Sequence, residues 1–254
     1  MFYYRRGAGE PLVLIHGIGH HWRAWEPVLD LLTSSYDVIA IDLPGFGQSP
    51  RPPGLPEGMP GAVQAVSELF DELGLDRVHV AGNSLGGGIA LELAATGRVA
   101  SATALSPAGF ASPAELRRAL RILNGMRMAT FLPTPAIRAF YRTSFGRAVS
   151  FGPIVTRPGR ISADRALADT LAMRRGKSFR RVVRSGRTYA YTGKPDVPVT
   201  VAWAEHDRIL PLSQAARARE LLPDAAHVTL HGCGHVPMSD DPAQVAEVIR
   251  RTAA

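Results

Sequence analysis

Residues 82–86 read Gly-Asn-Ser-Leu-Gly and lie between a strand-like run at 77–81 and a helix-like stretch at 87–95. Glycines spaced this way around a serine are typical of a sharp strand-to-helix turn, where the backbone is strained and side chains have no room. The spacing alone arises by chance in roughly one chain in five to ten of this size. Here the strand before it and the small-residue helix after it favour a functional turn. They predict that the hydroxyl of Ser84 lies above the edge of the sheet, at the end of a strand.

Strand-like and helix-like runs alternate on both sides of this turn. The alternation predicts an α/β fold: a mostly parallel sheet with helices on both faces. A chain of 254 residues with 46% hydrophobic content is long enough for one sizeable core. The predicted strands are 12–15, 37–41, 77–81, 99–105, 199–204 and 226–230, and the predicted helices are 22–32, 62–73, 87–95, 212–222 and 242–251.

Residues 107–197 interrupt the alternation. They contain no clear strand, only helix-like stretches at 113–123, 163–173 and 179–183. A connection of this length far exceeds the roughly 2–6 residues usual between a strand and a helix. We therefore expect a helical cap inserted into one domain, whose core is formed by residues 1–106 and 198–254.

The positive charge of the chain is concentrated in this inserted segment. Residues 107–197 hold 18 basic and 4 acidic residues, a net charge of +14, against −7 for the rest of the chain. A solvated arginine-rich face would explain this, and so would attraction of an anionic substrate or of an anionic lipid surface. Nucleic acid is not an expected partner, because no recognised motif is present and aromatic residues are sparse there.

The chain has no stretch of 18 uncharged apolar residues and no signal-peptide pattern at its start. Its one cysteine, Cys233, cannot form an internal disulfide, which fits a reducing compartment. A cytoplasmic protein is the expectation from these features. Cys233 lies close to His235, but a buried structural thiol is favoured over a second nucleophile.

A serine nucleophile needs a general base, and His235 is the best placed histidine. It follows the last predicted strand, so the parallel topology brings it to the same sheet edge as Ser84. The imidazole in turn needs a carboxylate to fix its tautomer. Asp207, a few residues after the fifth predicted strand, is favoured for this role over its neighbour Glu205.

The charge that develops on a carbonyl oxygen needs fixed N–H donors. The N–H of Leu85 lies at the start of the helix after Ser84, where the helix dipole also contributes. The second donor is expected in the loop after the first predicted strand, and we assign it to Ile18 within His16-Gly17-Ile18-Gly19. These residues need no metal and no cofactor.

Taken together, these residues resemble the α/β-hydrolase fold family. The order Ser84, Asp207, His235 matches the family's order of nucleophile, acid and histidine. The His16-Gly17 loop and the loop at 42–49 look like those of its capped branch, which includes esterases, carbon–carbon bond hydrolases, epoxide hydrolases, haloalkane dehalogenases and haloperoxidase-like enzymes. The resemblance covers residues 10–106 and 198–250. It implies Ile18 and Leu85 as the oxyanion pair and residues 107–197 as a lid.

Two subfamilies are disfavoured, because epoxide hydrolases and dehalogenases use a carboxylate nucleophile whereas this chain has Ser84. The chain departs from the family at its start. The family often has two further strands before the one at 12–15, and only residues 2–5 remain here to form them.

The function most favoured by the sequence is hydrolysis of a carboxylic ester, thioester or related carbonyl compound through an acyl-Ser84 intermediate. The expected partner is a small-molecule acyl substrate, and both an anionic and a lipid-like substrate remain open. Three alternatives remain open. The first is a carbon–carbon bond hydrolase of a dienone acid whose carboxylate a cap arginine holds. The others are an acyltransferase or perhydrolase with the same triad, and a non-catalytic ligand-binding member.

Overall fold

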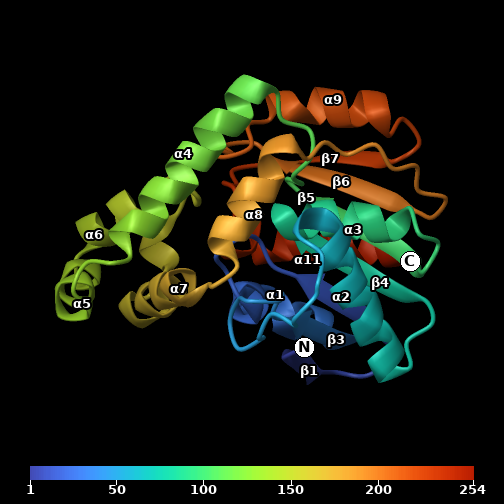
Figure 1. The fold of residues 1–254 in the computed structure, drawn as a ribbon, viewed down its shortest axis with the longest axis horizontal. Coiled ribbons are helices and arrows are strands. Elements are labelled where there is room, and N and C mark those ends of the chain that lie inside the picture. The colour runs from blue at the N-terminus through green and yellow to red at the C-terminus, as the bar shows by residue number, and fades with distance from the viewer.

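The computed structural model of the protein describes all residues from 1 to 254 and is built around one seven-stranded sheet (Figure 1). The strand order is β1-β3-β2-β4-β5-β6-β7, and every neighbouring pair is parallel except β1 with β3. The predicted α/β fold is thereby confirmed. The strands are β1 (Tyr3–Arg6), β2 (Glu10–Ile15), β3 (Tyr36–Ile41), β4 (Val78–Asn83), β5 (Val99–Leu105), β6 (Val199–Ala204) and β7 (Ala226–Leu230).

The first residues form an edge strand. Strand β1 pairs antiparallel with β3, with Tyr3 opposite Ile41 and Arg6 opposite Val38. Arg5 extends its side chain to Asp37 on β3 and donates hydrogen bonds of 2.6–3.0 Å. One antiparallel strand therefore stands at this edge, formed by nearly the same residues that the sequence left for two.

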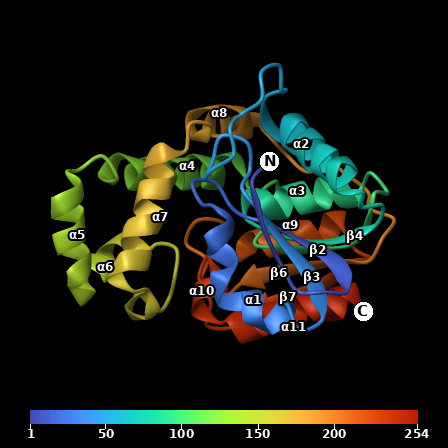
Figure 2. The same cartoon turned by 90° about the horizontal axis from the view of Figure 1, so that it is seen from below.

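Helices cover both faces of the sheet, which explains why its central strands are buried along nearly their whole length. Helices α2 and α3 lie on one face and α1 and α11 on the other, as Figure 2 shows. Every residue of β4 and β6 is buried. The helices of the core are α1 (Glu26–Leu32), α2 (Gly58–Leu73), α3 (Leu85–Ala94), α9 (Ser213–Leu221), α10 (Pro237–Asp240) and α11 (Pro242–Ala253), with the 3-10 turn η1 (Trp22–Trp25) before α1.

The segment between β5 and β6 contains helices and no strand, and it has two more α-helices than the sequence predicts. Helix α4 begins at a capping box between Ser112 and Glu115 and continues six residues beyond the predicted end. Helices α5 and α6 were not predicted, because prolines and glycines in 133–152 resemble loop signals; Pro135 instead lies in the first turn of α5, where proline is tolerated. The helices are α4 (Pro113–Ala129), α5 (Thr134–Arg142), α6 (Ser144–Phe151), α7 (Ala163–Arg175) and α8 (Phe179–Ser185), with 3-10 turns η2 (Pro158–Arg160) and η3 (Gly186–Thr188).

Helices α4 to α7 reach outward from one side of the sheet, while α8 lies over the core (Figures 1 and 2). Helix α8 packs on α2 of the core, whereas α5 packs on α6 and α7. Helices α5 and α6 consequently form the part of the segment that lies furthest from the sheet. None of the helices has the length and apolar character needed to span a bilayer.

Candidate active site

Ser84 occupies a strained turn between β4 and α3. Its backbone has φ 57° and ψ −115°, a conformation that a residue with a side chain adopts only at a cost of about 1–3 kcal/mol. The flanking glycines are required by space rather than by dihedral angles. A Cβ on Gly82 would lie 2.0 Å from the carbonyl oxygen of Gly86, and one on Gly86 would lie 2.1 Å from that of Ile15. The sequence pattern around Ser84 thus reflects backbone segments in direct contact.

His235 and Asp207 meet in a buried hydrogen bond. The Nδ1–H of His235 donates to Oδ2 of Asp207 over 2.7 Å, and the aspartate side chain has no exposed surface. The other carboxylate oxygen, Oδ1, accepts the N–H groups of Ile209 and Leu210, each at 2.8 Å. Every hydrogen bond of the carboxylate therefore fixes its orientation toward the imidazole, and Nε2 of His235 carries the lone pair.

Glu205, the alternative carboxylate, lies on the surface. Its side chain is partly exposed and accepts the N–H of Gly232 over 2.8 Å, near the exposed rings of His206 and His231. This N–H lowers the pKa of Glu205, but the side chain makes no contact with His235. The structure thus joins His235 to Asp207 and not to Glu205.

Asn83 connects the Ser84 turn to the His235 loop. Its Nδ2 donates to the carbonyl oxygen of His235 over 2.9 Å and to that of Leu105 over 3.2 Å. The hydroxyl of Ser84 makes no hydrogen bond to His235. The hydrogen bonds of His235 are those of its ring to Asp207 and of its carbonyl oxygen to Asn83. Such contacts are often long in enzymes without substrate and shorten in the complex. The structure therefore places the two side chains on neighbouring loops without a formed hydrogen bond.

The backbone N–H groups of Ile18 and Leu85 donate no hydrogen bond to a backbone carbonyl. Leu85 opens α3, and the Ile18 loop passes so close to Ser84 that a Cβ on Gly17 would lie 3.3 Å from the serine Cβ. Two free donors beside a serine are the arrangement that stabilises an oxyanion.

His16 holds this loop in place. Its Nδ1–H donates to the carbonyl oxygen of Gly17 over 2.7 Å, while Nε2 accepts the N–H of Leu43 over 2.9 Å. Complete burial lowers the pKa of His16 to about 3, so the ring is neutral. Asp42 ties down the next loop by accepting the N–H groups of Trp22 at 2.7 Å and Gln48 at 2.8 Å, and burial raises its pKa. Residues 42–49 thus brace the Ile18 loop from behind.

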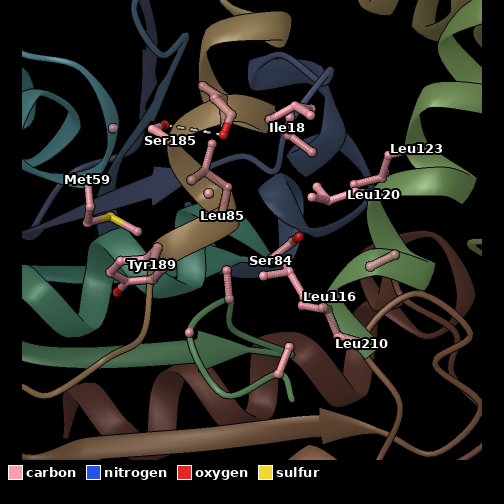
Figure 3. A pocket seen from close by; sticks show the side chains of 18 of the residues that line it. Ile18, Met59, Ser84, Leu85, Leu116, Leu120, Leu123, Ser185, Tyr189 and Leu210 are labelled. Carbon is pink, nitrogen blue, oxygen red and sulfur yellow. Dashed lines mark hydrogen bonds between the residues drawn. The ribbon is translucent and has the colours of Figure 1, made fainter. Parts of the chain in front are cut away.

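An apolar pocket of about 120 Å³ opens beside Ser84 (Figure 3). Leucines of α4 form one wall, Ile18 and Leu85 flank the serine, and α8 contributes the far side. No arginine, lysine, aspartate or glutamate lines it. Its principal side chains are Ile18, Met59, Leu85, Leu116, Leu120, Leu123, Val182, Tyr189 and Leu210.

A second cavity of about 210 Å³ lies on the other side of the Ile18 loop, between that loop and α4–α7. It is more polar, because its lining includes the side chains of His20, Tyr141, Asp169 and Thr170 among apolar neighbours. The Nδ1 atom of His20 is buried there without a partner, and burial lowers the pKa of His20 to about 4. Ile154, another lining residue, accepts the N–H of Val236, so the cavity adjoins the His235 loop.

Residues 12–248, nearly the whole chain, match the model of the alpha/beta hydrolase family. The chain belongs to this family. An uncharacterized protein of Mycobacterium tuberculosis is 28% identical over 96% of this chain and 75% of its own length. The epoxide hydrolase EphH of the same organism is 32% identical over 72% of this chain and 89% of its own. Among solved structures, a bacterial membrane phospholipase A superposes with a TM-score of 0.79 at 26% identity, covering 99% of this chain and 81% of that one.

In this alpha/beta hydrolase, two residues that position the His235 loop were not predicted from the sequence. Asn83 is one; Asp240 of α10 is the other, and its carboxylate accepts the N–H groups of Gly234 at 2.8 Å and of Thr156 and Arg157 at 2.9 Å. Asp240 therefore ties the His235 loop to the inserted segment. Only the position of Asn83, inside the 82–86 motif, offered a signal.

Cys233 is fully buried, as expected of a structural thiol. Burial raises the pKa of Cys233 to about 12, which leaves almost no thiolate at neutral pH. No group of three or more histidine, cysteine, aspartate or glutamate side chains is arranged to hold a metal ion.

Proposed function

We propose that this alpha/beta hydrolase is a serine esterase that cleaves esters of apolar carboxylic acids through an acyl-Ser84 intermediate. The observation that carries the proposal is the hydrogen bond of His235 to Asp207, because a carboxylate held by two further N–H groups fixes the imidazole with Nε2 free to accept a proton. A binding protein has no need of a base prepared in this way next to a strained serine.

Each proton has an assigned place in the reaction. His235 Nε2 accepts the proton of Ser84 Oγ as the oxygen attacks the ester carbonyl carbon, and the N–H groups of Ile18 and Leu85 stabilise the oxyanion. His235 then donates this proton to the departing alkoxide, the carbon–oxygen bond breaks, and the acyl group remains on Ser84. Water repeats the cycle through the same base and releases the acid.

The pocket beside Ser84 supports an apolar acyl group. The pocket volume is about 120 Å³, and one water molecule occupies about 10–15 Å³ on the same measure. The pocket therefore has room for about eight to twelve groups the size of a water molecule. A medium acyl chain of roughly six to ten carbons fits that space. The structural similarity to a phospholipase is consistent with a lipid-like substrate.

The lining also bears on the alternative of carbon–carbon bond hydrolysis of a dienone acid. That reaction assigns a cap arginine to the substrate carboxylate, and no arginine lines the pocket. We therefore favour ester hydrolysis. The leaving group is assigned to the second cavity, where His20 and Tyr141 offer polar contacts beside the His235 loop.

The test is hydrolysis of p-nitrophenyl esters whose acyl chains range from acetyl to hexadecanoyl. We expect kcat/KM to be greatest for a medium chain and Ser84→Ala to abolish turnover with its melting temperature unchanged. Ser34→Ala, at an exposed turn, is the matched control and should behave as the wild type. Turnover by Ser84→Ala, or no hydrolysis of any chain by a folded wild-type protein, would reject the proposal.

A further inference from the structure

Apolar side chains are exposed mainly at one place on the molecule. Eight large hydrophobic side chains of the chain are exposed, and six of them lie at the end of α4, in the turn that follows it, on α5 and on α6, at 40–70% exposure. Scattered single residues of this kind are ordinary, but a contiguous group marks an interaction surface. We call these six residues the apolar tip: Met128, Phe131, Leu132, Phe140, Phe145 and Val149.

The apolar tip is held together as one surface. The rings of Phe140 on α5 and Phe145 on α6 pack edge to face with centroids 6.3 Å apart. The two helices are in close contact there, since a Cβ on Gly146 would lie 2.1 Å from the carbonyl oxygen of Phe140. Figures 1 and 2 place α5 and α6 at the end of the molecule furthest from the sheet, where no part of the chain covers them.

Positive charge surrounds the apolar tip without any acidic partner. Residues 116–163 contain no aspartate or glutamate, and no arginine among them takes part in an ion pair. The guanidinium of Arg127 stacks 5.6 Å from the ring of Phe131. Arg138 and Arg142 are exposed on α5 one helical turn apart, two residues before and two residues after Phe140. We call the arginines of the tip helices the basic collar: Arg127, Arg138, Arg142 and Arg147.

We propose that the apolar tip and the basic collar dock the enzyme on an anionic phospholipid bilayer. Aromatic and aliphatic side chains inserted at the headgroup level, with arginines beside the lipid phosphates, are what holds amphipathic helices on such membranes. A second copy of this chain is a poor occupant, because it would bring two basic collars together. Nucleic acid would match the charge and leave the apolar tip uncovered.

Helix α4 connects this surface to the pocket. Leu116, Leu120 and Leu123 line the pocket from one part of α4, while Met128 lies at its end in the apolar tip. The eight residues from Leu120 to Met128 span about 12 Å of helix. A docked enzyme therefore holds the pocket wall close to the bilayer that would supply acyl chains, although docking itself does not require the proposed chemistry at Ser84.

The test is sedimentation of the full-length protein with vesicles of phosphatidylcholine, with and without about a third phosphatidylglycerol. We expect binding to the anionic vesicles that weakens with added salt, and binding at least tenfold weaker to phosphatidylcholine alone. Phe140→Ser/Phe145→Ser should lose at least tenfold in affinity. Arg138→Gln/Arg142→Gln should lose roughly 30-fold, as expected for two charges at an anionic surface.

Matched controls remove the same groups elsewhere. Leu221→Ser and Arg219→Gln change exposed residues of α9 and should bind as the wild type. Ser84→Ala should also bind normally, so failure of docking and failure of the proposed esterase chemistry are separately visible. Absence of wild-type binding, or tip variants that bind like the controls, would overturn the proposal. So would a tip-dependent dimer in light scattering that binds no vesicles.

A thiol-labelling measurement tests docking without the double substitutions, in case those variants fail to fold. Cys233 is buried, so an environment-sensitive thiol probe attached to Phe145→Cys reports from the apolar tip alone. We expect its emission to shift to the blue on anionic vesicles, while a probe at Ser34→Cys stays unchanged. Equal spectra at both positions would contradict insertion of the tip.

Discussion

Replacement of Asp207 by asparagine tests the hydrogen-bond geometry that supports His235. In the wild type, Oδ1 of Asp207 accepts the N–H groups of Ile209 and Leu210, and Oδ2 accepts Nδ1–H of His235. An asparagine has only one acceptor oxygen. Turning that oxygen toward His235 would leave two buried N–H donors facing an NH2 group, at about 1–3 kcal/mol each. The oxygen therefore stays on Ile209 and Leu210, and the NH2 group faces the imidazole.

This orientation places the proton on the wrong nitrogen. Nδ1 of His235 then accepts from the NH2 group of Asn at position 207, the ring proton moves to Nε2, and Ser84 loses its base. A wrong tautomer of this kind lowers kcat by about 10⁴, or about 5.5 kcal/mol of barrier. Because both backbone hydrogen bonds remain, the free energy of unfolding should change little.

Steady-state hydrolysis of p-nitrophenyl octanoate at neutral pH, together with urea unfolding, measures both quantities. Glu205→Gln is the matched control, since it changes the neighbouring carboxylate in the same way on the surface. It should keep kcat within about threefold of the wild type. A tenth or more of wild-type kcat in Asp207→Asn would refute the reasoning, and so would an equal loss in Glu205→Gln.

Three further changes probe the pocket, the Ile18 loop and the turn. Leu120→Trp fills the pocket and should lower kcat/KM for octanoyl esters at least tenfold with little effect on acetyl esters; equal losses would contradict the pocket assignment. Burial lowers the pKa of His16 to about 3, so below pH 6.5 His16 binds a proton in the unfolded chain but stays neutral in the folded protein. The contribution of His16 to stability is therefore present above pH 6.5 and falls by roughly 2 kcal/mol by pH 5 in urea titrations. His16→Asn should remove this part of the acid-induced loss and leave the part that comes from buried His20. Gly86→Ala forces a Cβ against the Ile15 carbonyl and should yield little folded protein, whereas Gly125→Ala, in open space on α4, should fold normally.

The sheet and its helices were predictable because apolar runs and turn residues encode them locally. Ser84, His235 and Asp207 could be selected together because parallel strands deliver their following loops to one edge of a sheet. The choice between Asp207 and Glu205 was harder. Both follow β6 within three residues, and only the turn at Ile209 and Leu210 separates the buried side chain from the exposed one.

The inserted segment was less predictable. The prolines and glycines of 133–152 suggest loops, yet α5 and α6 form there because they bury Ile137, Tyr141 and Phe151 against neighbouring helices. Local patterns also do not reveal the role of Asp240, because two of its three backbone partners, Thr156 and Arg157, lie more than eighty residues away. Contacts of this kind depend on tertiary packing, so the spacing of residues in the sequence does not predict them.

The proposed reaction depends on Ser84 being a nucleophile that His235 activates. Reaction with a fluorophosphonate probe, with the labelled residue located by peptide mass spectrometry, measures this reactivity. We expect rapid labelling of Ser84 alone in the wild type, none in Ser84→Ala and labelling slowed by orders of magnitude in His235→Ala. A label on another residue, or an undiminished rate in His235→Ala, would contradict the proposed reaction.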